Sequence, residues 1–284
     1  MNCLNMDVEK ELNNFIQEKM KNENLETIFP NRLLREDVLD LLERFCIVIY
    51  YPLSGEENNG FHVNDMPLGG ENREFVFINT AQTMEKQVFT AAHELGHIWR
   101  VDDFAVKRGL IDNTPDKREK IINRFAATLL IPEDDFRRIF KETYSKYENE
   151  NGKITIINLI HIIVVLMNHF FVPEKAIICR LVELKYLQPN IADLLIGEAS
   201  DLKEIIDNTV KLIIKNSGYV KFQKPSNKKW IKGLPELLER AENQNLVSRQ
   251  KIDQMRELFG LSEASVPSEM EKEVFLNEKE ENRK

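Results

Sequence analysis

Two histidines and a glutamate lie close together in the stretch AAHELGHIW, residues 91–99. His93 and His97 are four residues apart, so on a helix their side chains project from the same face. Imidazole nitrogens are common zinc ligands, and Glu94 adds a carboxylate beside them that is suited to take a proton from water. The spacing therefore predicts a hydrolytic zinc site, with His93 and His97 as metal ligands and Glu94 as the catalytic general base.

An amphipathic helix with two ordinary histidines is the alternative, because HExxH is a short pattern that occurs by chance. The neighbouring side chains are small or apolar, namely Phe89, Ala91, Ala92, Leu95, Ile98 and Trp99. Burying two histidines and a glutamate among them without partners would be unfavourable. Metal binding removes that cost, and the context therefore favours a metal site.

A third protein ligand has two candidates. Asp103 follows His93 at the distance at which metzincins carry their third ligand, but Arg100 stands where those enzymes have a turn-forming glycine. Glu119 lies on a later predicted helix, as the third ligand of gluzincins does, and Asn123 follows it by one helical turn. Asn123 is placed to orient His93 or His97 by a hydrogen bond. From the residues alone, Glu119 is equally well explained as a solvated helix residue, and both candidates stay open.

The composition narrows the class of protein. The chain has 284 residues and a formal net charge of −8, which argues against direct nucleic-acid binding. Its three cysteines, Cys3, Cys46 and Cys179, form no CxxC pair and indicate reduced thiols rather than a cysteine zinc site.

No membrane association is expected. The most apolar run, residues 154–172, is interrupted by Asn158, His161, Asn168 and His169, which are costly in lipid, so we interpret it as a buried helix. The first residues show no basic segment followed by an apolar one, so no secretory signal is predicted. We expect a cytoplasmic protein.

The coarse element pattern predicts an α+β fold that is mainly helical. Strands are expected at 45–53, 61–63 and 73–80, and helices at 4–25, 34–44, 84–101, 115–131, 133–147, 154–188, 190–217 and 234–260. Thr83 and Thr114 are predicted N-caps, the latter with Pro115 in the first turn. A small sheet would pack on a zincin-like HExxH helix. We predict a metallopeptidase domain at 1–150, with its core at about 30–148, a helical C-terminal domain at 151–265, and a flexible tail at 266–284.

Two motifs together resemble the ImmA/IrrE family of metallo-endopeptidases. The segment FVFINTAQTMEKQVFTAAHELGHIW is followed by EKIINRFAATLLIP, where that family typically shows E-x-x-A-N-x-F-A-x-x-L-L-x-P. The chain keeps Glu119, Asn123, Phe125, Ala126, Leu129, Leu130 and Pro132, and departs from the usual pattern at Ile121 and Ile122. The resemblance covers roughly residues 30–190.

This resemblance implies a gluzincin-like enzyme that binds one Zn²⁺ through His93, His97 and Glu119. It favours Glu119 over Asp103. Characterised members are bacterial or phage-like proteins that cleave helix-turn-helix repressors and so relieve repression, which implies a protein substrate of that kind. The alternative is a non-proteolytic regulator that binds a partner repressor or DNA, with zinc structural or vestigial.

Other features leave alternatives. Residues 159–187 have the rhythm of a helix-turn-helix, but Lys175, Arg180 and Lys185 are offset by Glu174 and Glu183, so a packing role is favoured over DNA binding. The strand at 73–79 is either a substrate-pairing edge or a core strand.

The remaining histidines and tyrosines carry weaker signals. His62 is expected at the surface, with stabilisation of a tetrahedral intermediate as the alternative. His161 and His169 are expected to be packed rather than ligating. Tyr50, Tyr51 and Tyr144 stay open as oxyanion donors.

Overall fold

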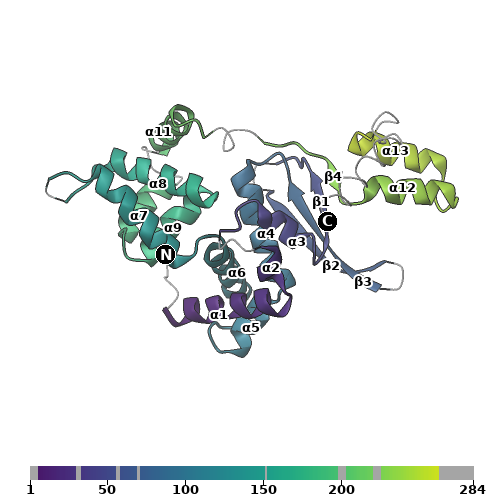
Figure 1. Ribbon diagram of the computed structural model, residues 1–284, viewed down its shortest axis with the longest axis horizontal. Helices are drawn as coiled ribbons and strands as arrows, with labels where there is room; N and C mark the ends of the chain where they lie inside the picture. Colours follow the sequence, from purple (N-terminus) through teal and green to yellow (C-terminus); the bar gives the residue numbers. More distant parts are fainter. Residues whose placement is uncertain are drawn as a thin grey trace, which may run out of the picture.

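The computed structural model describes residues 6–29, 33–55, 58–68, 71–150, 152–197, 203–219 and 225–261. Over these ranges helices surround a four-stranded sheet (Figure 1), which confirms the predicted α+β, mainly helical class. Cys3 and the predicted tail at 266–284 lie outside the described residues.

The sheet has the strand order β2-β3-β1-β4. Its strands are β1 (Ile47–Tyr51), β2 (Gly60–Leu68), β3 (Glu71–Asn79) and β4 (Trp230–Ile231). β1 is parallel to β3, and the β2–β3 and β1–β4 pairs are antiparallel. The strand predicted at 73–79 therefore lies inside the sheet, so its interpretation as an edge is wrong and that as a core strand is confirmed. The reason is that β2 and β3 extend into the stretch 64–72, where no strand was predicted: residues 66–68 of β2 pair with β3, which makes β2 the edge.

Three helices follow β3 in the chain and carry the predicted site residues. They are α4 (Met84–Ile98), α5 (Val101–Lys107) and α6 (Pro115–Leu130). Thr83 and Thr114 occupy the predicted N-cap positions, and Pro115 opens α6 as expected. The stretch after α4, where no helix or strand was predicted, forms α5. It begins after Arg100, which has φ 54° and turns the chain in the left-handed region without a glycine.

The other helices flank this core. N-terminal to the sheet are α1 (Met6–Asn22), α2 (Leu25–Ile28) and α3 (Asp37–Leu42), and after α6 come α7 (Glu133–Tyr147), α8 (Ile156–Phe170), α9 (Glu174–Glu183), α10 (Pro189–Ile196) and α11 (Lys203–Asn216). α7, α8, α9 and α11 gather on one side of the molecule (Figure 1).

On the other side, beyond β4, lie α12 (Leu234–Asn243) and α13 (Arg249–Phe259) (Figure 1). Phe259 of α13 packs on Tyr51 of β1, with 6.1 Å between the ring centroids. The predicted division of the chain at residue 150 stays a prediction.

The most apolar segment of the sequence forms α8, whose Ile162, Ile163, Val164 and Leu166 are buried in the core. No single helix among the described residues is long and apolar enough to cross a membrane. α8 and α9 reach that length and composition only as a pair, and the pair is bent by 106°.

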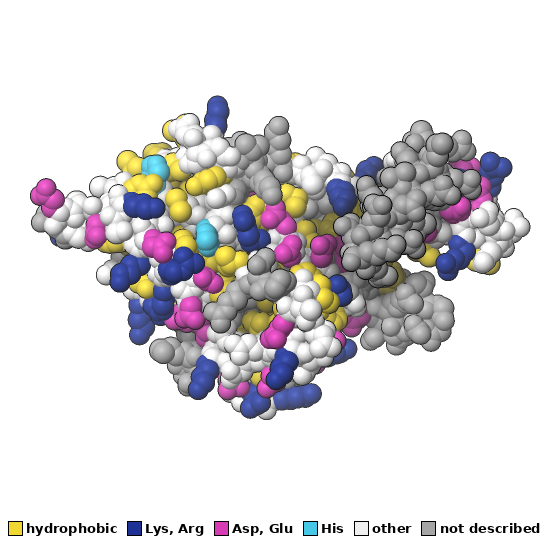
Figure 2. Space-filling model, in the orientation of Figure 1, with side chains coloured by type: hydrophobic (Ala, Val, Ile, Leu, Met, Phe, Trp, Pro, Cys, Tyr) yellow, Lys and Arg dark blue, Asp and Glu magenta, His cyan; other side chains and the backbone are white. Residues whose placement is uncertain are grey.

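The basic residues of the apparent helix-turn-helix do not form one surface. Lys175 and Lys185 are exposed, but Arg180 is fully buried, so it cannot contact a phosphate backbone. On the face shown in Figure 2, basic and acidic side chains are interspersed over the side of the molecule formed by α7, α8, α9 and α11. α9 therefore contributes to packing, as its sequence predicted.

Candidate metal centre

His93 and His97 project from α4 toward Glu119 on α6. The Nε2 atom of His93 lies 3.0 Å from Oε1 of Glu119 and 3.2 Å from Nε2 of His97. The Nε2 atom of His97 lies 3.7 Å from Oε2 of Glu119. One ligand atom from each of the three residues lies within 4.8 Å of the other two. The fold thus brings Glu119 to two histidines that lie 26 and 22 positions before it in the chain.

The donor set fits a zinc ion. In a tetrahedral site with bonds of about 2.0–2.1 Å, neighbouring donor atoms are about 3.4 Å apart. The two imidazole nitrogens are 3.2 Å apart, and the carboxylate of Glu119 lies 3.0 Å from His93 through Oε1 and 3.7 Å from His97 through Oε2, so all three distances are close to that value. Two imidazoles and one carboxylate are also the usual protein ligands of a catalytic zinc that keeps one position open. The side chain of Glu119 is 55% exposed, so the group opens to solvent.

Asn123 lies on the α6 face that meets His93. The Nδ1 atom of His93 is 3.2 Å from Oδ1 of Asn123, and Nδ2 of Asn123 donates to the main-chain oxygen of Glu119 at 3.0 Å. The second bond turns the amide oxygen toward the imidazole, so Nδ1–H donates and Nε2 is left bare for a metal. Asn123 thus holds His93, and not His97, in the orientation that a ligand needs.

Asp103 lies elsewhere. Its Oδ1 atom accepts a hydrogen bond from Nη1 of Arg118 at 2.9 Å, and its Oδ2 atom lies 3.9 Å from Nη1 of Arg100. Because α5 is helical from Val101, it directs Asp103 toward the start of α6 and not toward the histidines. The chain turns at Arg100 although this residue is not a glycine, so the missing glycine is no argument against Asp103 as a ligand. The argument against Asp103 is its ion pair with Arg118. The assignment of Glu119 as ligand stays a prediction that this geometry supports.

Glu94 is buried beside the two histidines, with 6% of the residue exposed. Burial raises the pKa of Glu94 to about 7, with the charge of Glu119 acting in the same direction and that of His93 against it. A carboxylate with a pKa near neutrality is suited to accept and return a proton.

His93 and Glu119 shift each other's pKa in opposite directions: that of His93 is raised and that of Glu119 is lowered. The close contact with His93 is the main cause that lowers the pKa of Glu119. Burial works to lower the pKa of His93, but Glu119 and Glu94 together raise it.

His62 lies next to this group, a position that was expected only under its alternative role in stabilising a tetrahedral intermediate. Its side chain is 10% exposed, its Nε2 atom is 3.4 Å from Oε2 of Glu74, and its ring centroid is 6.3 Å from that of His97. The expected surface placement of His62 is therefore wrong. The alternation along β2 and β3 turns His62 and Glu74 to the sheet face that α4 covers. The same two-residue alternation in the sequence could have placed Glu74 on this face, although no role was predicted for it.

The tyrosines and the other histidines whose roles were left open have partners away from the metal centre. The hydroxyl of Tyr50 donates to Glu43 at 3.0 Å, and that of Tyr144 donates to the main-chain oxygen of Gly152 at 2.9 Å. The rings of His161 and His169 pack on Tyr147 and Phe170, with centroids 5.6 and 4.8 Å apart, as expected for packed histidines. Tyr51 faces Phe259.

Gly96, the fourth residue of HELGH, lets α4 and α6 approach each other. A Cβ atom at this position would lie 2.9 Å from Cδ1 of Phe125 and 3.3 Å from two carbons of Ile122. These distances are shorter than ordinary carbon–carbon contacts of about 3.5–4.0 Å. A glycine is therefore what allows the helix of Glu119 to pack against the helix of the histidines.

Comparison with protein families matches residues 42–182 to Peptidase_M78, the IrrE N-terminal-like domain. The match includes all of α4 and α6, and with them the three clustered residues, Glu94 and Asn123. Comparisons with curated proteins and with solved structures find no match.

Proposed function

The chain belongs to the Peptidase_M78 family through its IrrE N-terminal-like domain at residues 42–182, and we propose that it is a zinc-dependent endopeptidase. The observation that carries the proposal is the convergence of His93, His97 and Glu119 at donor separations that suit one zinc ion. The family is one of peptidases, and this donor set is of the kind that hydrolytic zinc enzymes use.

His93, His97 and Glu119 would hold the ion, and Asn123 would keep His93 in the correct orientation. When bound, zinc lowers the pKa of water and polarises the carbonyl group of a peptide bond. Glu94 takes the proton of the attacking water and delivers it to the amine that leaves as the C–N bond breaks. Burial suits Glu94 to both steps, because it brings the pKa of the carboxyl to about 7.

The substrate in this proposal is an intracellular protein, specifically a helix-turn-helix repressor whose cleavage relieves repression. The resemblance to ImmA/IrrE peptidases supports this class. The edge strand β2, which carries His62 beside the centre, supports the proposal that an extended substrate backbone pairs with this edge. In this proposal β2, and not the strand at 73–79, is the edge that pairs with the substrate backbone.

The test compares the wild-type chain with Glu94→Gln in the native host or a co-expression host, and measures newly formed protein N-termini by mass spectrometry. The two side chains have nearly the same shape, so both proteins should carry the same amount of zinc. We expect new N-termini within a DNA-binding repressor only with the wild-type chain.

Equal cleavage by Glu94→Gln would refute the role of Glu94. Stable co-purification of an uncleaved repressor with the zinc-loaded wild-type chain would instead support sequestration, the non-proteolytic alternative.

A further inference from the structure

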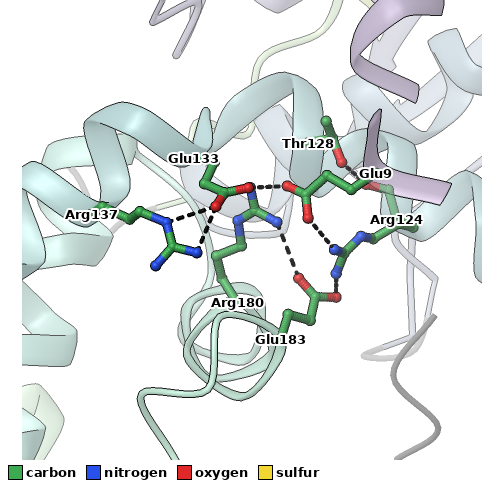
Figure 3. Close-up of polar contacts among 7 residues, drawn as sticks. All are labelled: Glu9, Arg124, Thr128, Glu133, Arg137, Arg180 and Glu183. Carbon is green, nitrogen blue, oxygen red and sulfur yellow. Dashed lines mark hydrogen bonds and ion pairs between the residues drawn. The ribbon is translucent and has the colours of Figure 1, made fainter. Parts of the chain in front are cut away.

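Four charged side chains from three helices meet in the interior (Figure 3). Glu9 lies on α1, Arg124 on α6, and Arg180 and Glu183 on α9. Nη2 of Arg124 donates to Oε2 of Glu9 at 2.7 Å, and Nη1 of Arg180 donates to Oε2 of Glu183 at 3.4 Å. Arg180 also pairs with Glu9, and Arg124 with Glu183, so each arginine contacts both carboxylates. We call these four residues the buried charge cluster.

The buried charge cluster is balanced, and three of its four residues are buried, while Glu183 is partly exposed. Arg180 is 0% exposed, Arg124 6% and Glu9 8%. Burial works to raise the pKa of Glu9, but the hydrogen bonds and charges of Arg180 and Arg124 lower it overall, so Glu9 is ionised. Two positive charges thus face two negative ones, and removal of one leaves an uncompensated charge in the interior, which is strongly unfavourable.

The cluster acts on the helix that carries Glu119 and Asn123. Arg124 is the residue after Asn123, and on the same helix Phe125 packs between α1 and α4. Phe15 of α1 meets the ring of Phe125 edge-on, with 6.5 Å between centroids. α6 is therefore held against the histidine helix from behind, by an ion pair and an aromatic contact that both come from α1.

We propose that Glu9 and Arg180 are positioning residues for the metal centre, which set the place of α6 through Arg124 and thereby the affinity for zinc. The proposal rests on the proposed zinc site, but not on the identity of the substrate. Glu9 precedes the matched family domain, which begins at residue 42. The N-terminal helix is then a working part of the peptidase, because it supplies a carboxylate that the two arginines of the domain require.

The experiment is a double-variant cycle read by the dissociation constant for zinc, measured by competition with a chromophoric chelator. The four proteins are the full-length wild type, Glu9→Gln, Arg180→Met and the combination of both. Each is assayed at a temperature at which circular dichroism shows it to be folded. Each single variant leaves an unbalanced charge, and we expect zinc binding about tenfold weaker, as for loss of other residues that support metal ligands. The combination leaves Arg124 paired with Glu183 and should recover affinity.

Two controls separate positioning from general destabilisation. Glu11→Gln removes a carboxylate of the same helix that faces Arg108 at 3.9 Å on the surface. Ile163→Ala shortens a buried side chain of α8, which packs on α7, α9 and α11. Both should leave zinc affinity unchanged, although the second lowers the melting temperature.

Several outcomes would overturn the proposal. If the single variants bind zinc as the wild type does and only melt earlier, the cluster is merely structural. If the combination binds no better than Arg180→Met, the charge balance is not what matters; this comparison remains available should Glu9→Gln fail to fold. If the wild-type chain binds no zinc, the proposed function fails together with this inference.

Discussion

Gly96→Ala tests whether the close approach of α4 and α6 builds the metal centre. The new methyl carbon would lie 2.9 Å from Cδ1 of Phe125, about 0.6 Å inside the shortest comfortable carbon–carbon distance. It would also lie 3.3 Å from two carbons of Ile122, one turn after Glu119. The least disruptive relief is a shift of α6 away from α4, which carries the Glu119 carboxylate away from the histidines.

Gly96→Ala should change the free energy of unfolding only slightly but weaken zinc binding clearly. Overpacking a core costs about 1–3 kcal/mol, while replacing a mid-helix glycine by alanine returns about 1 kcal/mol. The free energy of unfolding of the metal-free chain should therefore fall by only about 0–2 kcal/mol. The affinity for zinc should fall about tenfold, because a displaced ligand behaves like one that has lost its support.

The assay pairs thermal unfolding of the metal-free protein with a chelator competition titration. The matched control is Gly96→Ala combined with Phe125→Leu, which removes the ring that the methyl group meets and should restore much of the zinc affinity. Unchanged zinc affinity in folded Gly96→Ala would refute the reasoning, as would an equal loss in the combined variant.

Three further results are expected. His62→Ala should lower kcat for protein cleavage about a hundredfold, the lower end of the loss when one group that stabilises the transition state is removed. The zinc content should be unchanged, because His62 lies beside the centre but is not a ligand, and wild-type kcat would count against this role. Asn123→Ala should weaken zinc binding about tenfold by freeing the ring of His93, and equal affinity in the competition titration would contradict this. Since the pKa of Glu9 is lowered from its ordinary 4.5 in the folded state, its contribution to stability is present above about pH 4.5 and is lost as the pH falls below it. Melting temperatures between about pH 6 and pH 3 should accordingly fall less steeply in Glu9→Gln than in the wild type, and parallel curves would exclude the effect.

The parts of the site that depend on local spacing were predictable from the sequence. Four-residue spacing places His93 and His97 on one helix face, and the same period joins Glu119 to Asn123. Thr83, Thr114 and Pro115 begin the two helices that the centre needs, as helix-start chemistry indicates. Apolar and β-branched runs likewise marked β1 and β3.

Contacts between distant residues were not predictable in this way. The choice between Asp103 and Glu119 depends on where α5 and α6 place them. Residue spacing alone left both open, and only the resemblance to the ImmA/IrrE motif favoured Glu119. β2 was underestimated because the stretch NDMPLGGEN is rich in turn residues, although its residues 66–68 pair with β3. His62 and Glu74 therefore had no predicted partner, since their meeting depends on that pairing.

The buried charge cluster shows the same limit. Glu9 stands among the charged residues DVEKE, which is typical of a solvated helix face. Arg180 carried a weak signal, because it is a single charge within the apolar run AIICRLV. Its partners come from α1 and α6, far away in the chain, so the run could indicate burial but not the ion pairs that make burial tolerable.

Zinc content is the measurement that tests the central claim most directly. Metal analysis of the purified wild-type chain, Glu119→Gln and Asp103→Asn should show one zinc ion per wild-type chain. We expect Asp103→Asn to retain that content, because Asp103 pairs with Arg118, and Glu119→Gln to lose most of it after mild chelation. Retention of zinc by Glu119→Gln together with its loss from Asp103→Asn would contradict the account.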